Sequence, residues 1–347
     1  MEAALKPNHP YGVHLVGSVP LAVAPSVFRM ACEKLGDRLR RLPDGETGAR
    51  SRWVHWQLGV FESMDVFAPE LVDTGYIRRA QFRLKPGARP QDIRFPALGY
   101  ATAARESYAE FERMRERGEI PAHLKFLVSL PTPLAPVTSF VLPESRAAVE
   151  PRYEDRLFAE LDEILETVPS ERLAIQWDTA YEFALLEGVM SSGFPDPQAA
   201  ILERLVRIGN RVPAEVELGY HLCYGDSGRR HFKDPDDTAK LALVANHLAR
   251  HLARPLNWVH LPVPRARTDE AYFRPLSSLG LRPETELYLG LIHLTDGLDG
   301  ARRRLSAAGR HVRRFGVATE CGLGRRPPET IPALLDLHAR VSDLASE

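Results

Sequence analysis

The feature that most constrains the fold of this 347-residue chain is a recurring short apolar run that ends in polar residues able to do chemistry. Eight such runs are visible, and helix-like stretches separate most of them. They are residues 12–16, 39–42, 125–128, 173–177, 215–220, 256–259, 286–292 and 315–318. Short apolar runs that alternate with amphipathic helices predict parallel β/α units.

The predicted helices complete this alternation. They cover residues 153–168, 196–210, 237–252, 297–308 and 329–346. Eight strands in this arrangement predict an α/β fold, a (β/α)8 TIM barrel, whose active site forms at the carboxyl ends of the strands. A doubly wound parallel sheet is the alternative, since polar residues follow its strands as well. The length suits one barrel domain over residues 1–347.

One connection, after the second predicted strand, is much longer than the others and covers about residues 63–121. Within it, residues 81–87 and 92–96 alternate in polarity and have turn residues between them. This pattern predicts a β-hairpin insertion. A helix at about residues 100–117 is expected to follow it.

The composition excludes several classes of protein. Apolar residues make up 44% of the chain, enough for a full core, and the formal net charge is −1, which argues against a nucleic-acid partner. No run approaches the roughly 18 apolar residues of a membrane span, and the first residues lack the apolar core of a signal peptide. Three cysteines do not make a disulfide framework. We expect a cytoplasmic protein, monomeric or homodimeric, that binds neither nucleic acid nor membrane.

Two of the three cysteines follow predicted strands. His221 and Cys223 point the same way because strand residues alternate between faces, which places them about 7 Å apart. Together with Cys321 they offer one nitrogen and two sulfurs, which suit a tetrahedral Zn²⁺ ion with bonds of ~2.0 Å to nitrogen and ~2.3 Å to sulfur. The fourth ligand is open between His260, on the next strand and preferred, and Glu320. The third cysteine, in a helix-like stretch, is expected to pack in the core, which is also the ordinary role of a lone buried cysteine.

Carboxylates and histidines stand at other strand ends. Asp44 and Glu46 flank a glycine, where they either form a turn or hold a substrate ammonium group. Asp178 either caps the helix that follows it or binds a cationic group of a ligand. His14 and His293 are expected in the barrel interior or at its rim. Asp178 and His293 are the candidate catalytic residues.

Several motifs stand in a recognisable order. They are Gly17-Ser18-Val19-Pro20, Asp44-Gly45-Glu46, the strand ending at Asp178, His221-Leu222-Cys223-Tyr224 and Glu320-Cys321-Gly322-Leu323. In these motifs the chain resembles the catalytic C-terminal domain of cobalamin-independent methionine synthase, in the uroporphyrinogen decarboxylase/methionine synthase-like superfamily. The resemblance implies a barrel that transfers a methyl or alkyl group to a thiol activated by zinc at His221, Cys223 and Cys321. It also implies that Ser18, Glu46 and Asp178 grip the amino-acid part of a homocysteine-like thiol.

The chain departs from the family pattern in three places. His260 stands where the family has a zinc-binding glutamate, and Ile292-His293 stands near the position of the family's Asp-x-His. The amino-terminal half of the long methionine synthases, which contributes to folate binding, is not in this sequence. The expected partners are therefore a small-molecule thiol and a methyl or alkyl donor, with folate as one candidate among several.

Two other functions fit the same barrel. A metal-independent decarboxylase or other lyase would bind carboxylates with arginines, and Arg41, Arg50 and Arg52 lie near the second predicted strand. A non-catalytic binding protein would use zinc only as a structural staple. Its site would be closed by four ligands, whereas catalytic zinc keeps one position open.

Overall fold

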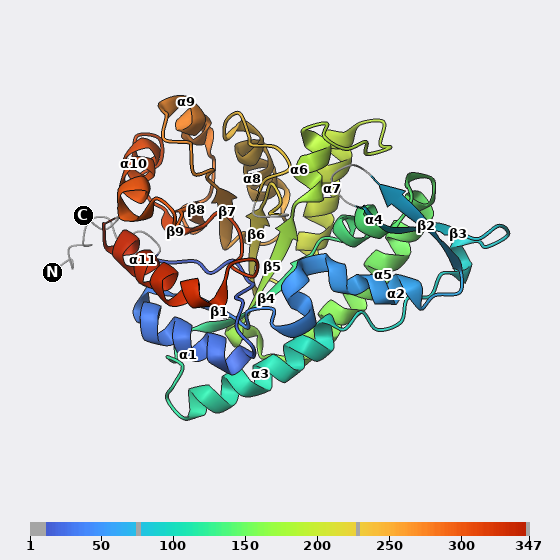
Figure 1. The fold of residues 1–347 in the computed structure, drawn as a ribbon, viewed down its shortest axis with the longest axis horizontal. Coiled ribbons are helices and arrows are strands. Elements are labelled where there is room, and N and C mark those ends of the chain that lie inside the picture. Colours follow the sequence, from blue (N-terminus) through green and yellow to red (C-terminus); the bar gives the residue numbers. More distant parts are fainter. Residues whose placement is uncertain (1–11, 74–77, 227–229, 345–347) are drawn as a thin grey trace.

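The structure, a computed structural model, describes residues 12–73, 78–226 and 230–344. Seven strands form one curled parallel sheet in the order β1-β4-β5-β6-β7-β8-β9 (Figure 1). They are β1 (Arg41–Pro43), β4 (Lys125–Pro131), β5 (Leu173–Thr179), β6 (Glu217–Leu222), β7 (Trp258–Pro262), β8 (Glu286–Ile292) and β9 (Gly316–Thr319). The order follows the chain without a reversal, unlike a doubly wound sheet. The fold is α/β and TIM-barrel-like.

Eleven α-helices occur in the described part of the chain, and the longer ones cover the outside of the sheet (Figure 1). They are α1 (Ala24–Leu35), α2 (Leu58–Glu62), α3 (Tyr100–Glu116), α4 (Leu134–Phe140), α5 (Pro143–Thr167), α6 (Tyr181–Leu186), α7 (Pro197–Asn210), α8 (Ala239–His251), α9 (Glu270–Phe273), α10 (Gly297–Gly309) and α11 (Ile331–Leu344). Helix α1 packs against both α3 and α11, so the first and last helices are neighbours. None of the described helices is long and apolar enough to cross a membrane.

The first predicted strand, residues 12–16, is reduced to a single bridging residue. Val13 pairs in parallel with Leu39 on one side and with Val317 on the other. The Val13 N–H donates to the Arg38 carbonyl (2.8 Å), and the His14 N–H donates to the Val317 carbonyl (2.9 Å). The curled sheet is therefore linked back on itself at this one residue, and the carboxyl ends of its strands share one rim.

The strand register brings polar side chains into rows across the interior. Asp178 on β5 stands opposite His221 on β6, which stands opposite His260 on β7. One row below, Gly219 lies beside Trp258. A Cβ atom at Gly219 would lie 1.9 Å from the Trp258 ring, so only glycine leaves room for this indole. The indole fills the barrel beneath the polar row.

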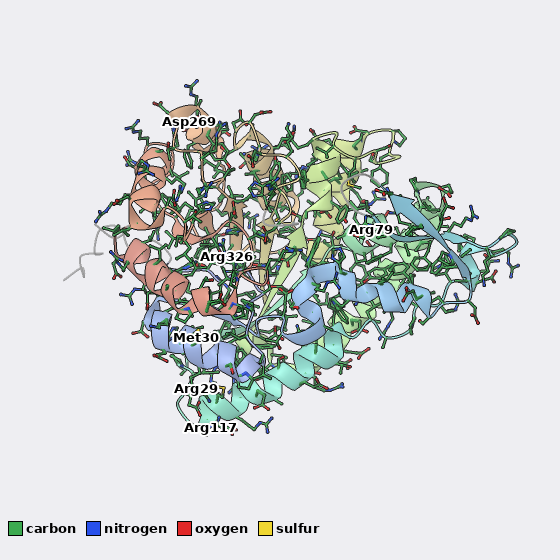
Figure 2. All side chains as sticks on the ribbon, in the orientation of Figure 1. Arg29, Met30, Arg79, Arg117, Asp269 and Arg326 are labelled. Atoms are coloured by element: carbon green, nitrogen blue, oxygen red, sulfur yellow. The ribbon has the colours of Figure 1, made fainter. Side chains whose placement is uncertain are left out.

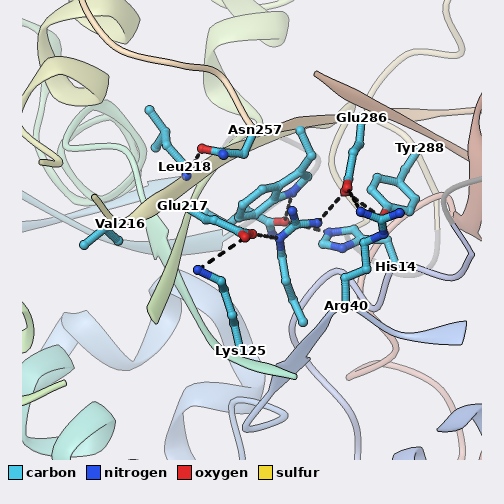
Figure 3. A network of polar contacts seen from close by, with 12 residues as sticks. His14, Arg40, Lys125, Val216, Glu217, Leu218, Asn257, Glu286 and Tyr288 are labelled. Atoms are coloured by element: carbon cyan, nitrogen blue, oxygen red, sulfur yellow. Dashed lines mark hydrogen bonds and ion pairs between the residues drawn. The ribbon is translucent and has the colours of Figure 1, made fainter. Parts of the chain in front are cut away.

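A buried ionic network closes the opposite end of the strands (Figure 3). The Arg41 guanidinium donates to Glu286 (2.8 Å) and to Glu217 (2.6 Å), and it lies 4.0 Å from the centroid of the Trp258 ring. The Tyr288 hydroxyl also donates to Glu286 (2.9 Å). Arg41 is thus part of the barrel floor and does not face the rim where a lyase would need it.

The insertion contains an antiparallel hairpin, but its pairing differs from the prediction. Strand β3 (Arg78–Leu84) includes the expected residues 81–84, and its partner is β2 (Phe67–Asp73). The prediction of a second strand at residues 92–96 was wrong: a short 3-10 helix ends at Asp92, and no strand follows before α3. Pro90 and Pro96 flank this segment, and proline cannot donate to a strand ladder. Helix α5 also starts earlier than predicted, at Pro143, and continues through Pro151.

Candidate metal centre

Three predicted metal ligands come together at the carboxyl ends of β6 and β9. His221 lies in β6, Cys223 follows this strand directly, and Cys321 lies two residues after β9. Their ligand atoms are all within 4.8 Å of one another, and the Sγ atoms of the two cysteines are 3.8 Å apart. Two thiolates on a tetrahedral zinc with ~2.3 Å bonds lie about 3.8 Å apart. The geometry of these three residues therefore fits a zinc ion.

The His221 imidazole has one nitrogen to spare. The ring is 3% exposed, and its Nδ1 lies 2.7 Å from Nδ1 of His260. Its Nε2 is buried and has no hydrogen-bond partner, although an unsatisfied buried polar atom is costly. Burial, followed by the neighbouring His260, holds the pKa of His221 well below its usual value. The ring is therefore in the neutral form that binds metals.

The two sulfurs interact with each other and with the backbone. The Gly225 N–H donates to the Cys223 Sγ (3.2 Å), and a backbone N–H at this distance stabilises a thiolate. The hydrogen bond with Cys223, followed by burial, raises the pKa of the Cys321 thiol well above its usual value. A bound divalent cation reverses this preference, because a coordinating thiol is deprotonated.

The two candidates for the fourth ligand lie outside the three-residue group. His260, on β7, uses Nδ1 toward His221 and Nε2 toward the Thr319 carbonyl (3.0 Å). Glu320 turns its carboxylate away, toward Nε2 of His231 (3.5 Å) and Nδ1 of His293 (3.7 Å). The described residues thus bring three ligand atoms together.

Two carboxylates of the predicted substrate site are poorly compensated. Asp178 is 7% exposed, and its Oδ1 accepts a hydrogen bond from Gln176 Nε2 (2.8 Å). Glu46 is half-buried at a backbone φ of +47°, and its carboxylate accepts no hydrogen bond from a described residue. Burial raises the pKa of Glu46 to about 7; burial and the charge of Glu46 raise the pKa of Asp178 well above its usual value. A cation near both would favour their ionised forms.

Ser18 and Asp44 have different surroundings. The Ser18 carbonyl accepts from the Leu323 N–H (2.7 Å), and its Oγ accepts from the Gly324 N–H (3.2 Å), so Ser18 lies against the loop that carries Cys321. Asp44 accepts from the Glu46 N–H (2.9 Å) and from Arg50 Nη2 (2.6 Å). Asp44 therefore forms a turn and an ion pair, and its carboxylate is already occupied.

The candidate catalytic His293 follows β8 at the same rim. Its Nε2–H donates to the Val263 carbonyl (2.8 Å), which leaves Nδ1 facing Glu320. Burial lowers the pKa of His293 to about 3 and raises the pKa of Glu320 to about 7. His231, the third member of this cluster, was missed by sequence reasoning because it lies in a loop without strand periodicity. His14 bonds to Gln176 (2.8 Å) in the barrel interior.

An aromatic pair with a cationic neighbour was also missed. The rings of Trp53 and Tyr181 stack with their centroids 6.2 Å apart, and Trp53 has a strained φ of +53°. Arg79, on β3 of the hairpin (Figure 2), donates to the Tyr181 hydroxyl (3.3 Å) and has no acidic partner among the described residues. Since Tyr181 begins the helix after β5, the inserted hairpin places a cation at the carboxyl ends of the strands.

Comparisons with known proteins point to one fold. No protein-family model matches the chain, and no curated protein matches it. Among solved structures, a B12-independent methionine synthase from Shewanella sp. W3-18-1, in complex with selenomethionine, superposes with a TM-score of 0.60 at 15% identity and covers 97% of each chain. A protein from Listeria monocytogenes, described as a candidate vitamin-B12-independent methionine synthase, gives a TM-score of 0.56 at 14% identity over 98% of each chain. Over nearly its whole length, the chain therefore has the fold of these methionine synthases, as its motifs had indicated.

Proposed function

We propose that this protein is a zinc-dependent transferase that moves a methyl or alkyl group from a donor to a small, homocysteine-like thiol. The observation that carries the proposal is the convergence of His221, Cys223 and Cys321 within 4.8 Å of one another at the rim of the strands. The fold supports it, because the similar solved structures are B12-independent methionine synthases, one of them in complex with selenomethionine.

When bound, zinc would keep the substrate thiol deprotonated at neutral pH, where a free thiol with a pKa near ~8.5 is mostly protonated. The chain's own residues orient this substrate: Glu46 and Asp178 receive its ammonium group, and Ser18 lies beside the Cys321 loop. A sulfur–carbon bond forms at the methyl or alkyl carbon while the carbon–donor bond breaks, and the donor keeps the electron pair. Such orientation can remove about 7 kcal/mol or more of the barrier.

The departing donor gains negative charge, which a proton neutralises. Glu320, whose pKa is raised to about 7, is the group that we assign as the donor of this proton, and Nδ1 of neutral His293, 3.7 Å from its carboxyl group, orients it. Of the two candidate catalytic residues, Asp178 binds the substrate in this scheme and His293 positions the proton donor, whereas Asp44 supports the turn that carries Glu46.

The rival functions have less support. Arg50 is already paired with Asp44, and Arg41 lies in the barrel floor, so neither is available to a lyase substrate. Of the three arginines only the exposed Arg52 is left for that role. A structural zinc staple needs four protein ligands, but three ligand atoms come together among the described residues. We also propose that residues 1–347 form one (β/α)8 barrel domain with an insertion at about 63–121, because the Val13 bridges join its first and last strands.

The deciding experiment is metal analysis combined with X-ray absorption spectroscopy. We expect one zinc per chain, bound by one nitrogen and two sulfurs of the protein, with a further sulfur appearing when L-homocysteine is added. Cys223→Ser should lower the zinc content, whereas the control Cys32→Ser, in α1, should keep it. Full thiol alkylation by zinc-free protein would refute the proposal, and an unchanged zinc environment on thiol addition would favour the structural staple.

A further inference from the structure

His260 stands behind the metal centre. Its side chain is fully buried on β7, directly across from His221 on β6. The two Nδ1 atoms are 2.7 Å apart, and the ring centroids are 4.7 Å apart. On its other side, His260 Nε2 lies 3.0 Å from the Thr319 carbonyl oxygen. The imidazole therefore connects the strand that carries His221 to the strand that precedes Cys321.

The positions of the protons follow from this chain of contacts. A carbonyl oxygen only accepts, so the Nε2 of His260 must carry a hydrogen. Neither imidazole contacts a carboxylate among the described residues, so both rings are neutral. The bare Nδ1 of His260 then accepts from the Nδ1–H of His221. Neutral His221 is left with its lone pair on Nε2, the atom that has no partner in the protein.

We propose that His260 is a positioning residue, not a metal ligand: it fixes His221 in the tautomer and orientation in which Nε2 faces the metal. The inference rests on the proposed zinc site. It assigns to this chain's histidine a role different from the ligand role that its place in the sequence suggested. A ligating histidine commonly donates its second N–H to such a partner, and loss of that partner weakens metal binding by about 10–100-fold.

The same contacts argue against His260 as a ligand. To coordinate the metal, its ring would have to release one or both of its present partners. Each partner that the ring released, the Thr319 carbonyl or the Nδ1–H of His221, would then be buried without a hydrogen bond, which is energetically costly. Thr319 also donates through Oγ1 to the Cys321 carbonyl (2.8 Å), so its displacement would disturb the loop of another ligand.

Two substitutions of similar size separate these roles. In His260→Asn, the side-chain oxygen can take the place of Nδ1 and accept from His221, whereas Leu in His260→Leu cannot accept. We expect His260→Leu to weaken zinc binding about 10–100-fold, and His260→Asn to retain most of the affinity, measured by competition with a chromophoric chelator. His338→Leu, which removes another fully buried histidine on α11, should leave zinc affinity unchanged.

The coordination sphere gives the decisive readout. X-ray absorption of the zinc-loaded proteins should show the same numbers of nitrogen and sulfur ligands in wild type and in His260→Leu. Loss of one nitrogen in the variant, or an unchanged zinc affinity, would overturn this inference while the zinc site itself stands. Failure of the wild-type protein to bind zinc would instead overturn the proposed function, and this inference with it.

A measurement on the unmodified sequence avoids any folding defect of the variants. Long-range ¹H–¹⁵N correlation spectra of ¹⁵N-histidine-labelled, zinc-loaded protein distinguish the two tautomers of each ring. We expect His260 with its hydrogen on Nε2 and His221 with its hydrogen on Nδ1. A His260 ring that carries its hydrogen on Nδ1, or that shows zinc bound to either nitrogen, would contradict the inference.

Discussion

At the scale of single residues, the pair Glu46 and Asp178 is the most sensitive to its surroundings. Asp178 is buried and Glu46 is half-buried, and Glu46 lies close enough for its charge to disfavour ionisation of Asp178. Gly17 leaves room for the Glu46 carboxylate, because a Cβ there would lie 2.3 Å from its Oε1. A positively charged group bound between these two carboxyls would lower the pKa of both and favour their ionised forms.

This pair predicts a pH dependence of substrate binding. The pKa of Glu46 is raised to about 7, so Glu46 is mostly protonated at pH 6 and mostly ionised at pH 8. Only the ionised form attracts an ammonium group, so the affinity for L-homocysteine should rise over this range. In Glu46→Gln the rise should shrink toward that of a thiol without an amino group, which still loses its thiol proton on binding, and the affinity at pH 8 should fall about 10–100-fold, the effect of a hydrogen bond to a charged group. Isothermal titration at several pH values measures both.

A thiol without the amino group is the matched control for this prediction. 4-Mercaptobutyrate lacks the ammonium group, so it should bind wild type and Glu46→Gln equally well. If it binds wild-type protein as tightly as homocysteine does at pH 8, the assignment of Glu46 and Asp178 to the ammonium group is wrong.

At the scale of elements, the strands are joined at their amino ends by the Arg41 network. Arg41 on β1 reaches Glu217 on β6 and Glu286 on β8, so one guanidinium ties together strands that are far apart in the sheet order. A buried ion pair contributes modestly in itself, but removal of one partner leaves buried charge without compensation. The network therefore makes the barrel floor intolerant of single substitutions.

We predict that Arg41→Ala lowers the free energy of unfolding by about 3–5 kcal/mol, measured by urea denaturation. The matched control is Arg38→Ala. Arg38 forms a bidentate pair with Asp343, but its side chain is 40% exposed and that of Asp343 60%, so its loss should cost about 1 kcal/mol or less. Equal losses of unfolding free energy in the two variants would show that burial of the Arg41 network does not make it more important for stability than an exposed ion pair.

Prediction from sequence succeeded where burial on both faces left a strong pattern. The run at 286–292 matches β8 residue for residue, since a strand covered on both sides is almost continuously apolar, as this one is after Glu286. Strand alternation and the shared rim of parallel strands likewise explain why His221, Cys223 and Cys321 could be grouped in advance. The run at 12–16 failed as a strand because only Val13 pairs with its neighbours.

Other parts of the site left no such signal. His231 lies in a loop and Trp53 in a strained 3-10 segment, where side chains follow no regular period. Arg79 contacts Tyr181 only because β3 pairs with β2. The alternating pattern of residues 92–96 had suggested a different partner strand, but the prolines in and beside that segment cannot donate to a ladder. Local patterns predicted these side chains poorly because tertiary pairing determines their positions.

At the scale of the whole molecule, the ligands are carried by a scaffold with its own continuous hydrophobic core. Zinc removal is therefore expected to leave the fold intact. A chelator should lower the thermal midpoint while the far-UV circular dichroism spectrum at 25 °C stays the same. Binding only to the folded state adds stability, about 4 kcal/mol at a zinc concentration 1,000 times the dissociation constant.

Cys223→Ser supplies the comparison for this experiment, because its midpoint should respond less to zinc and chelator than that of wild type. Unfolding of the wild-type protein on chelation would contradict the expectation. It would indicate that the metal is a structural element, as in small domains that are unfolded without zinc.

The one-residue bridge at Val13 has a further consequence for the motions of the barrel. Few hydrogen bonds close the sheet at this residue, so we expect local opening of the barrel to occur there first. Amide hydrogen exchange would show it as early loss of protection at His14 and Val317. Ser18 lies on the segment that follows Val13, and Cys321 lies on the loop that follows β9. A hydrogen bond between Ser18 and Gly324 joins these two segments. A ligand that contacts both segments should therefore slow this exchange, and the protein without ligand should show the faster rate.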